Sequence, residues 1–132
     1  MVKVKKQNSK STNQPNVLVV DDEPNILLSL EFLMKKNGYN VFVGRDGKEA
    51  LETVEKENID LIILDIMMPE VDGLEVCKRL KSNQSTAQIK VIFLSAKIKE
   101  EEIQAGYEAG ADMYITKPYS TRDIVNKVKE LI

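Results

Sequence analysis

The sequence predicts an α/β fold in which a parallel sheet of five strands carries helices on both faces. Short apolar runs rich in β-branched residues recur along the chain, and segments with helically spaced apolar residues separate them. Such alternation is typical of a parallel sheet, because parallel neighbours need a crossover connection and that connection is usually a helix. The length of 132 residues suits one domain with a substantial core.

The strands are predicted where the apolar runs are continuous. Unbroken apolar character indicates strands that are buried on both faces. The predicted strands are Val17–Val20, about Tyr39–Val43, Ile59–Leu64, Val91–Leu94 and Met113–Thr116.

The first helix follows the first strand. Pro24 stands where the first helical turn accepts proline, and Asn37-Gly38 provides a common C-terminal stop. The apolar positions between them have helical spacing: Ile26, Leu27, Leu30, Leu33 and Met34.

Capping signals and apolar spacing predict four more helices. Asp46 with Glu49 resembles a capping box that opens the second helix, and Ser120 with Asp123 begins the last. The fourth spans roughly Lys99–Ala109 and ends at Gly110. Apolar residues mark the helices as follows: Ala50, Leu51 and Val54 in the second, Leu74, Cys77 and Leu80 in the third, and Ile124, Val128, Leu131 and Ile132 on one face of the last.

Charge separates the N-terminus from the remainder. Residues 1–14 are polar and carry four lysines and no acid, so they hold +4 of a chain whose net charge is −2, and the remainder holds −6. We expect residues 1–15 to be a disordered basic tail, with a basic docking arm as the alternative, and residues 16–132 to be the folded domain. The balance predicts no direct nucleic-acid or membrane binding.

Composition excludes several classes of site and of location. The chain has no histidine, so no chemistry here uses an imidazole. The single Cys77 excludes an internal disulfide and a cysteine-cluster metal site, and we interpret it as a core residue. There is no secretory signal and no apolar stretch long enough for a bilayer, so we expect a cytoplasmic location.

Polar residues follow four of the predicted strands. Asp21 and Asp22 come after the first strand, Asp65 after the third, Ser95 after the fourth and Lys117 after the fifth. In an open α/β sheet this edge binds ligands. Carboxylate oxygens suit Mg²⁺, and their mutual repulsion should raise pKa values when no cation is bound.

The same residues suit phosphoryl transfer. A carboxylate can attack phosphorus to form an aspartyl phosphate, and the reaction mainly needs its charge neutralised. Lys117 can supply a positive charge and Ser95 a hydrogen bond. Each residue also has an ordinary interpretation: Asp22 as a helix N-cap, Asp65 as the start of a loop, Ser95 as a turn residue, and Lys117 as an unremarkable residue before proline. Their joint occurrence at four strand ends favours a shared site.

With these motifs the chain resembles the response-regulator receiver domain of bacterial two-component signalling, over about Asn16 to Ile132. The matching segments, in family order, are Val19-Val20-Asp21-Asp22-Glu23, Leu64-Asp65-Ile66-Met67-Met68-Pro69 with Asp72-Gly73, Leu94-Ser95-Ala96, Ala109-Gly110-Ala111-Asp112 and Tyr114-Ile115-Thr116-Lys117-Pro118. The resemblance implies a doubly wound, flavodoxin-like sheet with strand order 2-1-3-4-5.

The resemblance also implies a role for each site residue. Asp65 would be the phosphoacceptor. Asp22 would bind Mg²⁺ directly and Asp21 mainly through water, while Met67 would offer its backbone carbonyl. Lys117 would contact the phosphoryl group.

Two further residues would form a switch. Ser95 would turn toward the phosphate and Tyr114 would swing inward with it, although a strand aromatic packed on the last helix is the ordinary alternative for Tyr114. The family usually has a cis bond at the position of Lys117-Pro118.

The implied function is a phosphoryl-accepting signalling switch. Asp65 would take a phosphoryl group from a sensor histidine kinase or phosphotransfer protein with Mg²⁺, and the face of the fourth helix, fifth strand and fifth helix would then bind partners or a second copy differently. The output would be a separate protein target or a linked effector domain of a longer protein.

Two other functions were weighed. An aspartate-nucleophile phosphatase would want a second acid where Met67 stands. A pseudo-receiver that only binds partners should have lost part of the site. We therefore expect no enzyme activity beyond self-catalysed phosphorylation and dephosphorylation of the aspartate.

Overall fold

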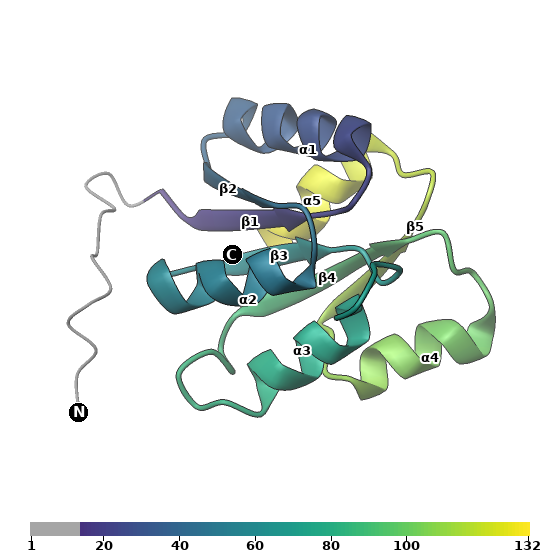
Figure 1. The fold of residues 1–132 in the computed structure, drawn as a ribbon. Helices are drawn as coiled ribbons and strands as arrows, with labels where there is room; N and C mark the ends of the chain where they lie inside the picture. The colour runs from purple at the N-terminus through teal and green to yellow at the C-terminus, as the bar shows by residue number, and fades with distance from the viewer. Residues whose placement is uncertain (1–13) are drawn as a thin grey trace.

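The computed structural model describes residues 14–132, so most of the predicted tail lies outside the described residues. Strands and helices alternate throughout the described part (Figure 1). The elements are β1 Asn16–Val20, α1 Pro24–Lys36, β2 Asn40–Gly44, α2 Gly47–Lys56, β3 Leu61–Leu64, α3 Gly73–Lys81, β4 Lys90–Ser95, α4 Glu100–Glu108, β5 Met113–Thr116 and α5 Thr121–Leu131.

The strands form one parallel sheet in the order β2-β1-β3-β4-β5, as the resemblance implied. The register aligns the strand ends, since Val20 pairs with Gly44 on one side and with Leu64 on the other. The chain leaves β1 toward β2 and later returns to β3 on the opposite side of β1. This reversal places a crevice outside the carboxyl ends of β1 and β3.

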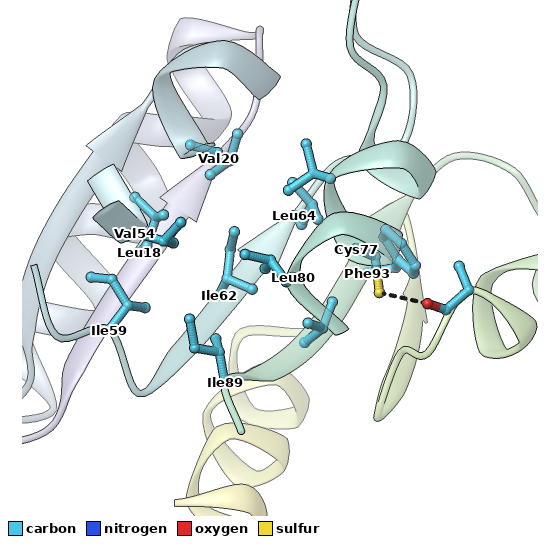
Figure 2. Packing of buried hydrophobic residues seen from close by; sticks show 14 of the residues in the cluster. Leu18, Val20, Val54, Ile59, Ile62, Leu64, Cys77, Leu80, Ile89 and Phe93 are labelled. Atoms are coloured by element: carbon cyan, nitrogen blue, oxygen red, sulfur yellow. Dashed lines mark hydrogen bonds between the residues drawn. The ribbon is translucent and has the colours of Figure 1, made fainter. Parts of the chain in front are cut away.

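Apolar layers on both faces of the sheet hold it in place. Helices α1 and α5 cover one face, and α2, α3 and α4 cover the other (Figure 1). Leu18, Ile62 and Phe93 of the central strands are fully buried on the second face, where they pack with residues of α2 and α3 (Figure 2). A fully buried side chain of this kind contributes about 1.5–3 kcal/mol relative to an exposed one.

Cys77 is a core residue, as predicted. It is fully buried on α3, and its thiol donates a hydrogen bond to the carbonyl of Ala109 over 3.4 Å (Figure 2). Burial raises the pKa of this thiol to about 11, which keeps it protonated and unreactive.

Helix signals in the sequence are largely confirmed. Pro24 opens α1, Gly38 with a φ of +92° follows its end, and Ser120 caps α5 by accepting from the amide of Asp123. Asp46 caps α2 through the amide of Glu49.

Several details were predicted wrongly. β2 is Asn40–Gly44 rather than about Tyr39–Val43, and α4 is Glu100–Glu108 rather than roughly Lys99–Ala109. β4 is Lys90–Ser95 rather than Val91–Leu94, so Ser95 is its last residue and does not follow it. The Glu49 carboxylate accepts from the amide of Arg45 rather than of Asp46, so the capping box is not reciprocal. β3 begins at Leu61 rather than Ile59. Ile132 follows the end of α5 and is 40% exposed, so it does not belong to the buried face of that helix.

Among the described helices, none combines the length and the apolar character needed to cross a bilayer.

Candidate functional site

The three predicted acids meet at the carboxyl ends of β1 and β3. Asp21 is 1% exposed and Asp65 5%, whereas Asp22 is exposed to solvent. One carboxylate oxygen of each lies within 4.8 Å of the others. Parallel strands in register account for this, since the amide of Asp65 donates to the carbonyl of Val20 over 3.0 Å.

Lys117 approaches the acids from the end of β5. Its Nζ donates to Asp21 Oδ2 over 2.9 Å and lies 3.7 Å from Asp65 Oδ1. Burial opposes the charge on Lys117, but the hydrogen bond to Asp21 and the charge of Asp65 outweigh it and raise the pKa of this ammonium. The lysine therefore stays protonated in a site where it balances buried carboxylates.

Burial and neighbouring charges shift the pKa of the Asp65 carboxyl. Burial, together with the charge of Asp21, raises the pKa of the Asp65 carboxyl from 3.8 to about 6, and Lys117 opposes part of that shift. The group is still mostly ionised at neutral pH. A cation bound nearby would stabilise the ionised form of Asp65 and lower its pKa.

The donor set fits Mg²⁺. Oxygen donors converge from Asp21, Asp22 and Asp65, with no sulfur or nitrogen donor in the group. Mg²⁺ favours few carboxylates together with waters and a phosphate, and the exposure of Asp22 leaves room for both.

The interpretation of Asp22 as a helix cap is wrong. Glu23 occupies the N-cap position of α1 and makes no side-chain cap bond. Asp21 Oδ1 accepts from the amide of Glu23 over 2.9 Å, so Asp21 supports the chain where it turns into the helix. This leaves the Asp22 side chain available at the mouth of the site.

Ser95 and Tyr114 are joined through the loop after β4. Ser95 is fully buried, and its Oγ accepts from the amide of Lys97 over 3.1 Å. The hydroxyl of Tyr114 donates to the carbonyl of Lys97 over 2.8 Å. One residue thus links the two predicted switch residues.

The ring of Tyr114 packs against aromatic and helical neighbours. Its centroid lies 6.0 Å from that of Phe93 and 6.4 Å from that of Tyr107. The alternative of a strand aromatic packed on the last helix is wrong, because the ring packs with the cluster on the α2, α3 and α4 face and lies against Gly106 of α4, whereas α5 packs on the other face. The bond between Lys117 and Pro118 is cis, as the resemblance implied.

Met67 lies in the loop after β3, and its side chain is 58% exposed. It borders an open hollow of about 510 Å³ together with Asp22 and Lys97. The hollow opens Asp22 to solvent on this side.

Sequence reasoning assigned no role to Glu23. Its Oε1 lies 3.2 Å from Lys117 Nζ and accepts a hydrogen bond from it. Two signals in the sequence pointed to it: its place directly after Asp22, and its position in the segment Val19-Val20-Asp21-Asp22-Glu23 that matches the family.

Comparisons with known proteins agree with this geometry. The family model described as response regulator receiver domain matches residues 17–129. The alkaline phosphatase synthesis transcriptional regulatory protein PhoP of Bacillus subtilis is 43% identical over 116 residues, which is 88% of this chain. The chain spans about half of that relative, namely 48% of its length.

Solved structures show the same fold. Chemotaxis protein CheY4 of Vibrio cholerae superposes with a TM-score of 0.85 at 27% identity, covering 90% of this chain and 99% of that one. The receiver domain of Francisella response regulator 1452 superposes with a TM-score of 0.83 at 36% identity, covering 89% of this chain and 96% of that one.

Proposed function

The chain belongs to the response regulator receiver domain family, and from that premise we propose that it is a signalling switch in which Asp65 accepts a phosphoryl group. One observation carries the proposal. The buried carboxylate of Asp65 lies at a sheet edge together with two further carboxylates and the ammonium of Lys117, 3.7 Å from its Oδ1.

The chemistry follows from these groups. An Asp65 oxygen forms a bond to phosphorus while the bond from phosphorus to the donor breaks, and the donor leaves with that electron pair. In a phosphohistidine donor whose other ring nitrogen is protonated, the imidazole leaves as a neutral ring. Lys117 contacts the transferred oxygens, and the Ser95 hydroxyl donates to one of them once it turns from the amide of Lys97.

Asp21, Asp22, Asp65 and the backbone carbonyl of Met67 would hold Mg²⁺. When bound, the ion neutralises charge on the phosphoryl oxygens.

The output would run through Tyr114. Movement of Ser95 toward the phosphoryl group changes the loop at Lys97, to which the Tyr114 hydroxyl is bonded. The face formed by α4, β5 and α5 then changes its shape and its affinity for a partner protein, a linked effector region or a second copy. The similar relative is named a transcriptional regulator, which favours a linked effector region.

The phosphodonor would be a sensor histidine kinase or a phosphotransfer protein in the cytoplasm. A phosphatase acting on a separate substrate is less well supported, because the residue two positions after Asp65 is the exposed Met67.

The first experiment is incubation with acetyl phosphate and Mg²⁺, followed by intact-mass measurement. We expect one phosphoryl adduct that requires Mg²⁺ and is absent in Asp65→Asn. Lys117→Ala should still bind Mg²⁺ but lose the change on the α4-β5-α5 face.

An adduct that persists in Asp65→Asn would contradict the assignment of the acceptor. If the wild type forms none, incubation with a phosphorylated histidine kinase separates a preference for protein donors from a receiver that is not phosphorylated at all.

A further inference from the structure

Lys117 lies within 4 Å of three carboxylates and donates hydrogen bonds to two of them. It is within hydrogen-bond distance of Asp21 at 2.9 Å and of Glu23 at 3.2 Å, but 3.7 Å from Asp65. The residue expected to receive the phosphoryl group is therefore the one from which the ammonium is held furthest. The ammonium has a third N–H that can donate to a phosphoryl group on Asp65, and a move of Lys117 toward that group would lengthen one or both of its two hydrogen bonds.

The two hydrogen-bonded partners differ in how easily they can leave. The Asp21 side chain is 1% exposed, so in the metal-free protein the loss of Lys117 would leave it a buried and unpaired charge. The Glu23 side chain is 63% exposed, and water can replace the ammonium there at little cost. Glu23 is therefore the partner that can release Lys117.

Helix capping does not explain the presence of glutamate at this position. Glu23 stands at the N-cap of α1, where Ser, Thr, Asp and Asn are preferred, and its side chain caps nothing. Its amide is held by Asp21 Oδ1 over 2.9 Å. This bond anchors the backbone from which the longer glutamate side chain reaches Lys117.

We propose that Glu23 is a positioning residue for Lys117: its carboxylate holds the ammonium away from Asp65 in the unphosphorylated protein and releases it when Asp65 carries the phosphoryl group. The inference rests on the phosphoryl-accepting role proposed for Asp65. Glu23 does not contact the reacting atoms, and it acts through the lysine.

On this proposal, the contact between Glu23 and Lys117 is present before phosphorylation of Asp65 and is lost during it. A contact that is present in the starting state and lost in the transition state raises the barrier. Exposed ion pairs are weak, so we expect removal of the contact to accelerate phosphorylation by about 1.5- to 5-fold.

Two substitutions separate position from charge. Glu23→Gln removes the negative charge. Glu23→Asp keeps the charge but is one methylene shorter, and aspartate at an N-cap bonds to helix amides instead. With acetyl phosphate at saturating Mg²⁺, both variants should form the Asp65 adduct faster than the wild type. Acceleration in Glu23→Gln alone would mean that simple repulsion of the donor is responsible, and unchanged rates in both would equally overturn the proposal.

A second readout follows Lys117 directly. The ¹⁵N signal of its ammonium should differ between the wild type and both variants in metal-free protein, and should converge once Mg²⁺ and the phosphoryl mimic beryllofluoride are bound. A difference that persists in the bound state would show that Glu23 keeps its contact, and would overturn the release step.

Failure of this proposal is distinct from failure of the proposed function. If wild-type protein forms the Asp65 adduct and the variants match it in rate and in the Lys117 signal, only the role of Glu23 is wrong. If the wild type is phosphorylated neither by acetyl phosphate nor by a kinase, the phosphoryl-accepting role falls, and the role of Glu23 falls with it.

Discussion

Asp65 is a carboxyl group that the fold places in a low-polarity setting beside a second buried acid. Its pKa of about 6 means that the folded state binds the proton more tightly than the unfolded state, whose ordinary value is 3.8. The resulting contribution to stability is fully present below pH 3.8 and is lost as the pH rises through about 6. At neutral pH without a cation, ionised Asp65 therefore costs stability.

We predict that Asp65→Asn stabilises the metal-free protein at pH 7.5 by on the order of 2 kcal/mol, and by much less at pH 4. Asparagine is nearly isosteric and carries no charge to bury or repel. The measurement is urea unfolding of both proteins in EDTA at the two pH values. If the two proteins differ in stability by the same amount at pH 7.5 and at pH 4, the ionisation of Asp65 is not the cause of the difference.

At the scale of elements, helix α4 approaches β5 through a glycine. A Cβ on Gly106 would lie 2.9 Å from Tyr114 Cδ2 and 3.2 Å from Phe93 Cδ2, both closer than ordinary contact. Because Gly106 has no Cβ, the Tyr114 ring can lie against α4 while its hydroxyl donates a hydrogen bond to the carbonyl of Lys97. The packing of one helix on one strand thus determines where the predicted switch residue lies.

We predict that Gly106→Ala destabilises the protein by about 1 kcal/mol, because overpacking outweighs the better helix propensity of alanine. In a Tyr114→Ala background the same change should be neutral or stabilising, since the obstructing ring is gone. A double-mutant cycle by thermal unfolding tests this. If Gly106→Ala destabilises the protein equally with and without the Tyr114 ring, the cost comes from the contact with Phe93 rather than with Tyr114.

At the scale of the whole molecule, the direction of the sheet gathers the site. All five described strands run parallel, so their carboxyl ends share one edge and the acids accumulate there. The apolar layers on both faces hold those ends rigid. Because the acids are gathered only in the folded sheet, a cation that binds them raises the free energy of unfolding.

Mg²⁺ at ten times its dissociation constant should raise the free energy of unfolding by about 1.4 kcal/mol, and EDTA should reverse this. Thermal unfolding at increasing Mg²⁺ measures the effect. Asp22→Asn should reduce the stabilisation, whereas the control Glu101→Gln, an exposed acid on α4, should not. Equal Mg²⁺ stabilisation in both variants would argue against binding at the acid cluster.

Much of this molecule follows from local sequence patterns. Apolar runs and helix signals predicted the ten described elements and placed the predicted strand ends within two residues of the observed ones, because burial and capping act over a few residues. The errors fall where local signals compete: Glu49 could bond to either of two neighbouring amides, and Ile132 lies where helical spacing continues past the packed face. The strand order came from the family resemblance rather than from any local pattern.

The sequence by itself determined that Asp21, Asp22, Asp65, Ser95 and Lys117 belong at one edge, since residues that directly follow parallel strands must emerge on the same side. Only the tertiary structure decided that Asp21 is buried while Asp22 is exposed, that Tyr114 reaches the carbonyl of Lys97, and that Glu23 shares Lys117 with Asp21. These relations depend on side-chain conformations and loop paths between segments as far as 96 residues apart, and no periodicity along the chain encodes contacts at that range.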